Sequence, residues 1–453
     1  MNKLSQINNE FSNLFKDNID KLNKSSQIIS QYRENALDKF YQLGIPTRQN
    51  EDYKHTDLKP VFENKHNYYF EQSKINFKID DIFQCDIPNI DTTTIILLNG
   101  WYHNKNGEKL KTLPGGAIIG SLDEASKKYP ELFEKHYSKY AKFENDSLVA
   151  LNSAFAQDGL FLYLPKNSIV EKPIQIINIL LSEEALFVQH RNLIIAEENS
   201  HAKMVICDHS LSPHKFLTNS VTEGIIGKNA FLDYFKIQNE HNESSQISSA
   251  FFQQEANSTL NFNTISLHGG LIRNNINILL NAEFCENNLF GLYLTDKTQH
   301  ISNHTVVDHV KPNCVSNQVY KGVLDDFASG TFTGKVIVRK DAQHTIAHQS
   351  NKNILLTDIT KIHSKPHLEI YADDVKCSHG ATVGQLDEDA IFYCQARGIA
   401  KHEARLLLMY AFANEIVKKI TIEPLKERID DLVNKRLRGE LSRCNNCALN
   451  CHA

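Results

Sequence analysis

Apolar residues recur every three or four positions along the first 45 residues of the chain. The recurring residues are Leu4, Ile7, Phe11, Phe15, Ile19 and Leu22, with mostly polar residues between them. This spacing is typical of amphipathic helices, which place such positions on one face. Gly44-Ile45-Pro46 then supplies a helix stop. We therefore expect an N-terminal helical and mixed domain over residues 1–92.

After residue 92 the pattern changes to short β-prone runs separated by Asn, Gly, Asp and Ser, and helical spacing nearly vanishes. The first run, residues 94–98, is followed by Asn99-Gly100, a dipeptide typical of tight hairpin turns. An Asn-Ser or Asn-Ala dipeptide recurs at residues 199, 229, 257 and 281, in steps of 30, 28 and 24 residues. Such a repeat favours a stacked β-solenoid over a sandwich, because each coil buries one face against its neighbour. We expect this core domain to span residues 93–385.

Helical spacing returns after Asp387, which is a suitable N-cap because two acidic residues follow it in the first turn. Gly398 offers a stop for this helix. A second helix is expected over residues 401–421, and a third from Pro424 to a stop at Gly439. Three consecutive amphipathic helices predict a docking module within a C-terminal domain, residues 386–453.

Composition excludes several partners. The 49 Lys and Arg residues are balanced by 54 Asp and Glu residues, without large blocks of one sign, so no nucleic-acid footprint is present. The N-terminus lacks the apolar region of a signal peptide, and no run approaches the roughly 20 apolar residues that cross a bilayer. We therefore expect a soluble cytoplasmic protein without nucleic-acid or membrane partners.

Nine cysteines are spread thinly over the chain, which favours reduced thiols over a disulfide framework. Three of them crowd the C-terminal tail, where Cys444, Cys447, Cys451 and His452 provide four potential metal ligands. One short arc lacks the separated second pair of ordinary structural zinc sites. A terminal thiol cluster is the favoured interpretation, and a metal site is the alternative.

Eight of the 20 histidines fall between His300 and His379, including three pairs spaced four apart: His300/His304, His344/His348 and His363/His367. The sequence between His344 and His348 lacks the glutamate of a zinc protease, so hydrogen-bonded structural histidines are favoured. Residues 330–336 resemble a phosphate loop but are one residue short and lack Ser or Thr after Lys335. We expect no ATP hydrolysis by this chain.

Residues 368–399 hold the strongest candidate site, because a predicted strand carries Cys377 and His379 ahead of the first C-terminal helix. On one regular strand, alternate residues from Glu369 to His379 would share a face, whereas a turn at Asp373-Asp374 would reset that phase. A thiolate and a neutral imidazole both bind iron. The alternative is a small buried thiol beside a hydrogen-bonded turn histidine.

The same region carries a resemblance to a known family. Residues 373–387 read D-D-V-K-C-S-H-G-A-T-V-G-Q-L-D, and F-Y-x-x-x-R-G follows at residues 392–398. Further motifs are Lys311-Pro312, Tyr320-Lys321-Gly322, Phe332-x-Gly334-Lys335, Gln349-x-Asn351-Lys352-Asn353 and E-D-Y-K-H-T-D-L at residues 51–58. In these motifs the chain resembles the SufB/SufD family of the Suf iron–sulfur cluster assembly system. It is most similar to the D component, because S-H-G-A-T at residues 378–382 stands where the B component reads E-H-E-A-T.

Two departures from the family pattern are present. Tyr53 and His55 stand where the family usually shows Trp and Tyr, and Cys394 stands where D components mostly carry a hydrophobic residue. The first departure weakens the N-terminal match, and the second blurs the distinction from B components.

The resemblance implies a mainly β fold, with a right-handed parallel β-helix core between N-terminal and C-terminal α-helical domains. It implies a non-catalytic scaffold that pairs with a SufB-like subunit and docks a SufC-like ABC-type ATPase. His379, with Cys377, would lie at the heterodimer seam where clusters are assembled, and Arg405, Phe412 and Glu415 are candidates for the ATPase contact. No tightly bound cofactor is expected, a transient iron–sulfur cluster or iron is expected at a subunit interface, and flavin binding stays open. Two alternatives remain: a SufB-like or homodimeric subunit that itself carries a cluster, and a β-helix carbohydrate-active enzyme.

Overall fold

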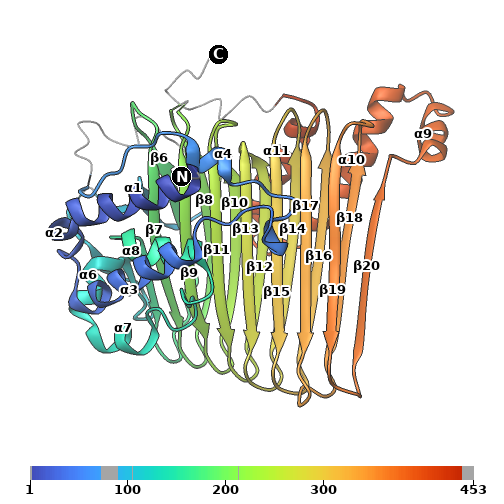
Figure 1. Cartoon of the computed structure of the whole chain (residues 1–453). Coiled ribbons are helices and arrows are strands. Elements are labelled where there is room, and N and C mark those ends of the chain that lie inside the picture. Colours follow the sequence, from blue (N-terminus) through green and yellow to red (C-terminus); the bar gives the residue numbers. More distant parts are fainter. Residues whose placement is uncertain (1–2, 73–89, 105, 213, 441–453) are drawn as a thin grey trace.

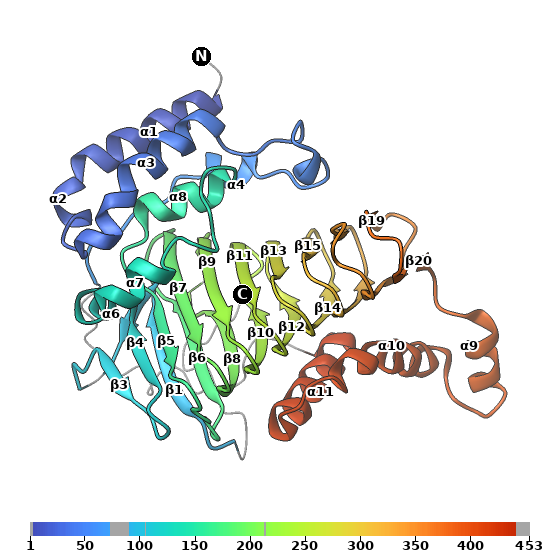
Figure 2. The ribbon, with the colours of Figure 1, turned by 90° about the horizontal axis from the view of Figure 1, so that it is seen from below.

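A computed structural model of the chain describes residues 3–72, 90–104, 106–212 and 214–440. Two ten-stranded sheets face each other, and the chain alternates between them so that each coil adds one strand to each sheet. Helices cover the outside of both sheets (Figure 1, Figure 2). The structure is a β-solenoid between helical regions, which confirms the fold class predicted from the sequence.

Strands of each sheet pair with the strands one coil before and after them. The first sheet contains, in spatial order, β2 (Trp101–His103), β1 (Thr93–Leu98), β6 (Ile174–Leu180), β8 (His201–Ser210), β10 (Phe231–Asn239), β12 (Thr259–His268), β14 (Glu286–Thr295), β16 (Val315–Leu324), β18 (Ile346–Leu355) and β20 (Lys376–Gly384). The second contains β19 (Lys361–Ile370), β17 (Ser329–Val338), β15 (His300–His309), β13 (Leu271–Leu280), β11 (Ser245–Gln254), β9 (Leu217–Ile226), β7 (Phe187–Ala196), β5 (Leu160–Leu164), β4 (Ile118–Ser121) and β3 (Leu110–Thr112). From β5 and β6 onward the pairing within each sheet is parallel. The Asn99-Gly100 hairpin between β1 and β2 is confirmed, with φ of 48° and 84°.

Left-handed residues shape the turns that lead into the first sheet. Asn199, Asn229 and Asn257 have φ of 57°, 56° and 56°, and each stands two residues before a strand. Asparagine tolerates this conformation better than most residues. The fourth predicted repeat, at Asn281, is wrong, because the left-handed residue of that turn is Phe284. In each of these turns the left-handed residue stands two positions before the next strand, whereas the type of amino acid at that position varies.

N-terminal helices and three later ones lie against the second sheet. They are α1 (Lys3–Asp17), α2 (Ile19–Leu22), α3 (Gln27–Leu43), the 3-10 turn η1 (Glu51–Tyr53), α4 (Lys59–Glu63), α6 (Leu122–Lys128), α7 (Pro130–His136) and α8 (Ser147–Phe155). Phe11 of α1 and Phe155 of α8 pack edge-on against each other, and Phe11 packs in the same way on Phe187 of β7. The expectation that helices vanish after residue 92 is wrong for α6, α7 and α8. All nine residues of α8 are buried, so this helix has no polar face to generate a period.

The three predicted C-terminal helices are confirmed as α9 (Glu388–Gln395), α10 (Lys401–Val417) and α11 (Glu423–Leu437). The Asp387 carboxylate caps α9 by accepting from the Asp389 and Ala390 backbone N–H groups. Helices α10 and α11 pack on apolar side chains of the outer face of the first sheet, including Phe235 and Leu292. Of the three C-terminal helices, α9 lies farthest out, past the last strand β20 (Figure 2).

The Tyr320-Lys321-Gly322 motif is explained by packing between neighbouring coils. Gly291 pairs with Tyr320, and Tyr293 pairs with Gly322, so each buried tyrosine ring covers a glycine of the adjacent strand. Lys321 points the opposite way, toward α10. The glycines therefore make room for the aromatic rings inside the solenoid.

Substituting Gly322→Ala will destabilise the protein by about 1–3 kcal/mol, because overpacking a filled interior forces side chains off their rotamers. The new Cβ would overlap the Tyr293 ring and Asn353 Oδ1. Gly384→Ala in β20 is the matched control, since a Cβ there meets no atom within 4 Å. Urea unfolding midpoints test the pair, and equal midpoints would contradict the packing argument.

Candidate functional site

The solenoid ends in an open coil. β20 is the last strand of the first sheet and β19 the last of the second, and neither has a strand partner on its outer side in the described part of the chain. Apolar side chains at this end are exposed: Ile370 by 41%, Tyr371 by 60% and Val383 by 47%. Unpaired edges with exposed apolar residues are typical of surfaces that bind another protein.

Cys377 and His379 lie on β20 and point toward the interior of this open coil. They pair in register with Ala347 and Gln349, which are buried inside the preceding coil. The prediction that Cys377 and His379 share a face is confirmed. The longer shared face back to Glu369 is wrong, because a turn between β19 and β20 separates the two segments. Since no further coil follows β20 among the described residues, the His379 side chain is exposed and Cys377 is partly exposed.

Cys377 and His379 differ in how readily their side chains can bind a metal ion. Cys377 packs beside Val336, Val338 and Ala347, and burial raises the pKa of its thiol. A raised pKa keeps the thiol protonated at neutral pH, and a protonated thiol is a poor metal ligand. His379 has no such neighbours and is the more accessible donor.

The motif at residues 51–58 forms a strap over the outer face of the second sheet (Figure 1). The Arg273 guanidinium lies 4.5 Å from the Tyr53 ring centre and donates to Asp52 O at 2.9 Å. His55 stacks on His363 of β19 with ring centres 3.7 Å apart, and the strap's Glu51 pairs with Lys365 at 2.8 Å. The strap thus links the N-terminal region to the last coil.

A cavity of about 490 Å³ lies between the strap and the open end. His55 and Lys54 line it from the strap, and Thr331, Ala381 and Val383 line it from the last coils. The cavity is continuous with the rim of the open end, so a molecule seated on β20 would also contact the strap.

Each of the six paired histidines has a partner within the protein. His300 contacts Thr56 and Ser329, His304 contacts Asp52, His344 contacts Asp374, His348 contacts Ser378, His363 stacks on His55, and His367 contacts Glu369. Structural roles, as predicted, account for all six. Within residues 3–72, 90–104, 106–212 and 214–440, no group of three or more His, Cys, Asp or Glu side chains is arranged to hold a metal ion.

The candidate docking residues on α10 have different environments. Lys321 of β16, almost fully buried, donates to Phe412 O at 3.1 Å and forms an ion pair with Glu415, while its ammonium lies 4.3 Å from the Phe412 ring centre. The hydrogen bond from Lys321 lowers the pKa of Glu415. Phe412 and Glu415 therefore anchor α10 to the solenoid, and Arg405 is partly exposed.

Sequence reasoning missed the exposed aromatic pair of α9. Phe392 is 71% and Tyr393 58% exposed, and the Arg397 guanidinium lies 3.4 Å from the Tyr393 ring centre. Ile391 is the only buried residue of this eight-residue helix. The signal was the adjacency of Phe392 and Tyr393, since consecutive helical positions point about 100° apart and only one stripe can face the core.

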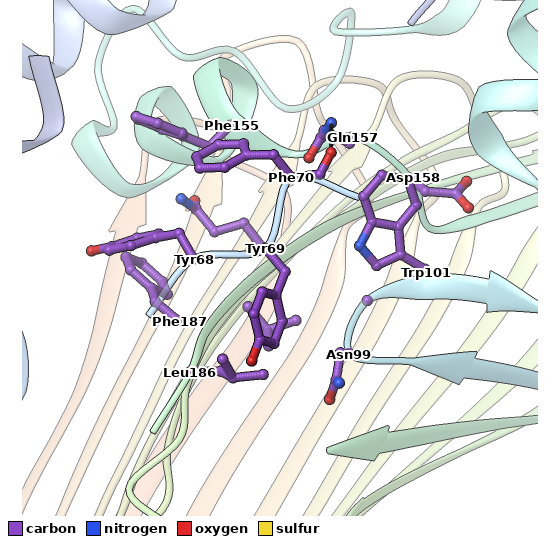
Figure 3. Close-up of a pocket in the computed structure, with 13 residues that line it drawn as sticks. Tyr68, Tyr69, Phe70, Asn99, Trp101, Phe155, Gln157, Asp158, Leu186 and Phe187 are labelled. Carbon is purple, nitrogen blue, oxygen red and sulfur yellow. Dashed lines mark hydrogen bonds between the residues drawn. The ribbon is translucent and has the colours of Figure 1, made fainter. Parts of the chain in front are cut away.

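A small pocket lies between the N-terminal region and β1–β2, lined by Tyr68, Tyr69, Phe70 and Trp101 among others (Figure 3). Its volume of about 30 Å³ suits a water molecule and is too small for a nucleotide or flavin. None of the helices in the described part of the chain has the length and apolar character needed to cross a bilayer. Cys444, Cys447, Cys451 and His452, the candidate metal ligands of the C-terminal thiol cluster, lie outside the described residues.

Comparisons with known proteins agree with this architecture. Residues 179–412 match the family model "SUF system FeS cluster assembly, SufBD core domain", and residues 5–176 match "SufBD protein N-terminal region". An iron–sulfur cluster assembly SufBD family protein of Synechocystis sp. is 26% identical over 418 residues, covering 90% of this chain and 91% of the relative. The iron–sulfur cluster assembly protein SufD of Escherichia coli is 25% identical over 413 residues (90% and 93%), and that of Bacillus subtilis 26% over 372 residues (78% and 81%).

Proposed function

Because the chain belongs to the SufBD family of the Suf iron–sulfur cluster assembly system, we propose that it is the D-type, non-catalytic scaffold subunit of that system. In this role it pairs with a SufB-like subunit and docks a SufC-like ABC-type ATPase, in the cytoplasm. Membership of this family argues against the alternative that the chain is a β-helix carbohydrate-active enzyme.

The open end of the solenoid is the observation that carries the proposal. Two unpaired edge strands, exposed apolar side chains and the inward-facing His379 meet on one surface. A partner with a matching edge would continue both sheets and cover this surface. The same partner would enclose His379 and Cys377 in a seam shielded from water.

A cluster or iron ion at the seam would need ligands from both subunits. His379 and Cys377 are two donors, and the described residues around them supply no third. Cluster assembly is therefore a property of the pair of subunits, and the isolated chain holds no tightly bound cofactor in this proposal. Iron or a nascent cluster would be substrate at the interface.

The ATPase would dock on α9 and the adjacent start of α10. Phe392 and Tyr393 present apolar surface that the described residues leave exposed, and Arg405 lies nearby in sequence with a partly exposed side chain. Aromatic residues and arginine are enriched among residues that dominate binding energy. Phe412 and Glu415 act indirectly by holding α10 on the solenoid.

Co-expression of the chain with its candidate partners tests the proposal. A tagged chain is expected to purify with a sister subunit and an ATPase in fixed stoichiometry. A stable homodimer that binds its own iron–sulfur cluster, seen by its visible absorption after anaerobic reconstitution, would instead establish the B-like alternative.

Replacing both Phe392 and Tyr393 by alanine will weaken capture of the ATPase by roughly tenfold or more, since exposed aromatic anchors carry much of an interface's energy. Pull-down at graded ATPase concentrations measures the change. Tyr41→Ala is the matched control, because Tyr41 is 55% exposed on α3 at the other end of the molecule. Undiminished capture would remove α9 from the ATPase interface.

A further inference from the structure

A column of small buried residues runs along one corner of the solenoid. Its members each stand directly before a strand of the first sheet: Ser200, Ala230, Ser258, Cys285, Cys314 and Thr345. Val315 N donates to Cys285 O at 2.9 Å, and Ile346 N donates to Cys314 O at 3.0 Å, which continues the parallel ladder of the strands. Cys285 and Cys314 are therefore direct, in-register neighbours.

The turns themselves need only a small hydrogen-bond donor at this position. Ser258 Oγ donates to Glu255 O at 2.6 Å and Thr345 Oγ1 donates to Ala342 O at 2.8 Å, each three residues upstream. The Cys285 thiol makes the equivalent contact with Ala282 O at 3.1 Å. Serine would satisfy the same turn, so local structure does not account for two adjacent thiols.

The Cys285 and Cys314 thiols lie close enough together to bind one metal ion between them. Both sulfur atoms lie 3.1 Å from the same acceptor, Ala282 O. The two thiols also hydrogen-bond to each other, and their strands lie about 4.8 Å apart, as neighbouring strands of one sheet do. Two thiols that already contact each other and share one acceptor need little movement to bind a single soft metal ion together.

His309 provides an independent observation at the same corner. Its side chain is fully buried, Nε2 lies 2.8 Å from Ser316 Oγ, and Nδ1 has no hydrogen-bond partner in the described part of the chain. The ring interacts with the Cys314 thiol. In the tautomer in which Ser316 donates to Nε2, Nδ1 carries the proton and can donate to a thiolate at Cys314.

Entry to the corner requires movement of a single turn. Phe284, immediately before Cys285, is 56% exposed and has φ of 59°, a conformation that bulky residues rarely adopt. Local opening of this turn exposes the sulfur of Cys285 while the strands stay paired.

We propose that Cys285 and Cys314 form a buried two-thiolate site for a monovalent thiophilic cation, Cu(I). Binding joins one Cu(I) to both sulfur atoms and releases their two protons to solvent, with no electron exchanged. Thiolates select soft ions such as Cu(I), and linear coordination needs only two protein ligands. His309 is a positioning residue that donates to the Cys314 thiolate.

The test uses the full chain with Cys444, Cys447 and Cys451 changed to serine, which removes the other close set of thiols. This reference protein, reduced and free of oxygen, is titrated with Cu(I) against the chelator bicinchoninate. We expect it to retain roughly one equivalent more than its Cys285→Ser or Cys314→Ser derivative. Both derivatives are expected to fold, because Ser258 occupies the same place in the column. Cys394→Ser, which removes a half-buried thiol elsewhere, should bind as the reference does.

His309→Asn should keep the stoichiometry but weaken Cu(I) retention by about tenfold, the usual effect of losing a hydrogen bond to a metal ligand. X-ray absorption should report two sulfur neighbours in the reference protein. Equal Cu(I) retention by the reference and the Cys314→Ser derivative would overturn the proposal.

Discussion

His379→Ala will lower the iron and acid-labile sulfide content of the reconstituted complex at least about tenfold, with the folding of the chain unchanged. The imidazole is exposed on the last strand, so its removal leaves no cavity, and the free energy of unfolding should move by less than about 0.5 kcal/mol. Cys377→Ser should reduce cluster content less, because burial raises the pKa of that thiol. Metal and sulfide analysis of the co-purified complex, with urea unfolding of the chain alone, measures both quantities.

His348→Ala is the matched control for this prediction. His348 stands on the neighbouring strand β18 and points outward, where it contacts Ser378 at 2.6 Å. The His348→Ala variant removes the same type of side chain one strand away, on the opposite face of the sheet. Equal cluster loss in the two variants would mean that the effect comes from the coil as a whole and not from the inward-facing imidazole.

Arg191→Met will destabilise the protein by about 3–5 kcal/mol, because it leaves a buried carboxylate without its counter-charge. Arg191 and Glu223 are fully buried and 2.8 Å apart under α7 and α8. Arg191 also donates to Ser153 Oγ at 2.8 Å, and Glu223 accepts from Ser138 N at 2.8 Å. The pair therefore ties the helical cap to the second sheet, and urea unfolding should show the loss.

Two comparisons isolate the cause of this effect. Arg339→Met breaks a surface pair with Asp308, in which the arginine is 52% exposed, and should cost at most about 1 kcal/mol. The double variant Arg191→Met/Glu223→Gln removes both charges and should recover part of the loss. If it is as unstable as Arg191→Met alone, the cost lies in packing and not in the uncompensated charge.

The sequence predicted those helices and turns whose ends are marked by a residue at the boundary itself. Asp387 marks the start of α9 by capping it, and Gly398 and Gly439, both left-handed, follow shortly after the ends of α9 and α11. The asparagine turns marked the solenoid for the same reason. In both cases one residue fixes its own backbone conformation, independent of distant contacts.

Features set by long-range packing were not predictable in this way. The phase of β20 depends on a turn after β19, so the shared face of Cys377 and His379 was predicted while its extension to Glu369 was not. The orientation of α10 depends on the outer face of the first sheet. The unbroken apolar run at residues 204–207 was the available signal, since strands buried on both faces lose the usual alternation.

In-register stacking also means that the length of the solenoid grows by a constant amount with each coil. Each coil moves the last strand farther from the N-terminal helices by one strand spacing, about 4.8 Å. Gain or loss of a whole coil would change the reach of the subunit in fixed increments without new packing rules. The separation between the helical cap and the partner surface is therefore set by how many coils the gene encodes.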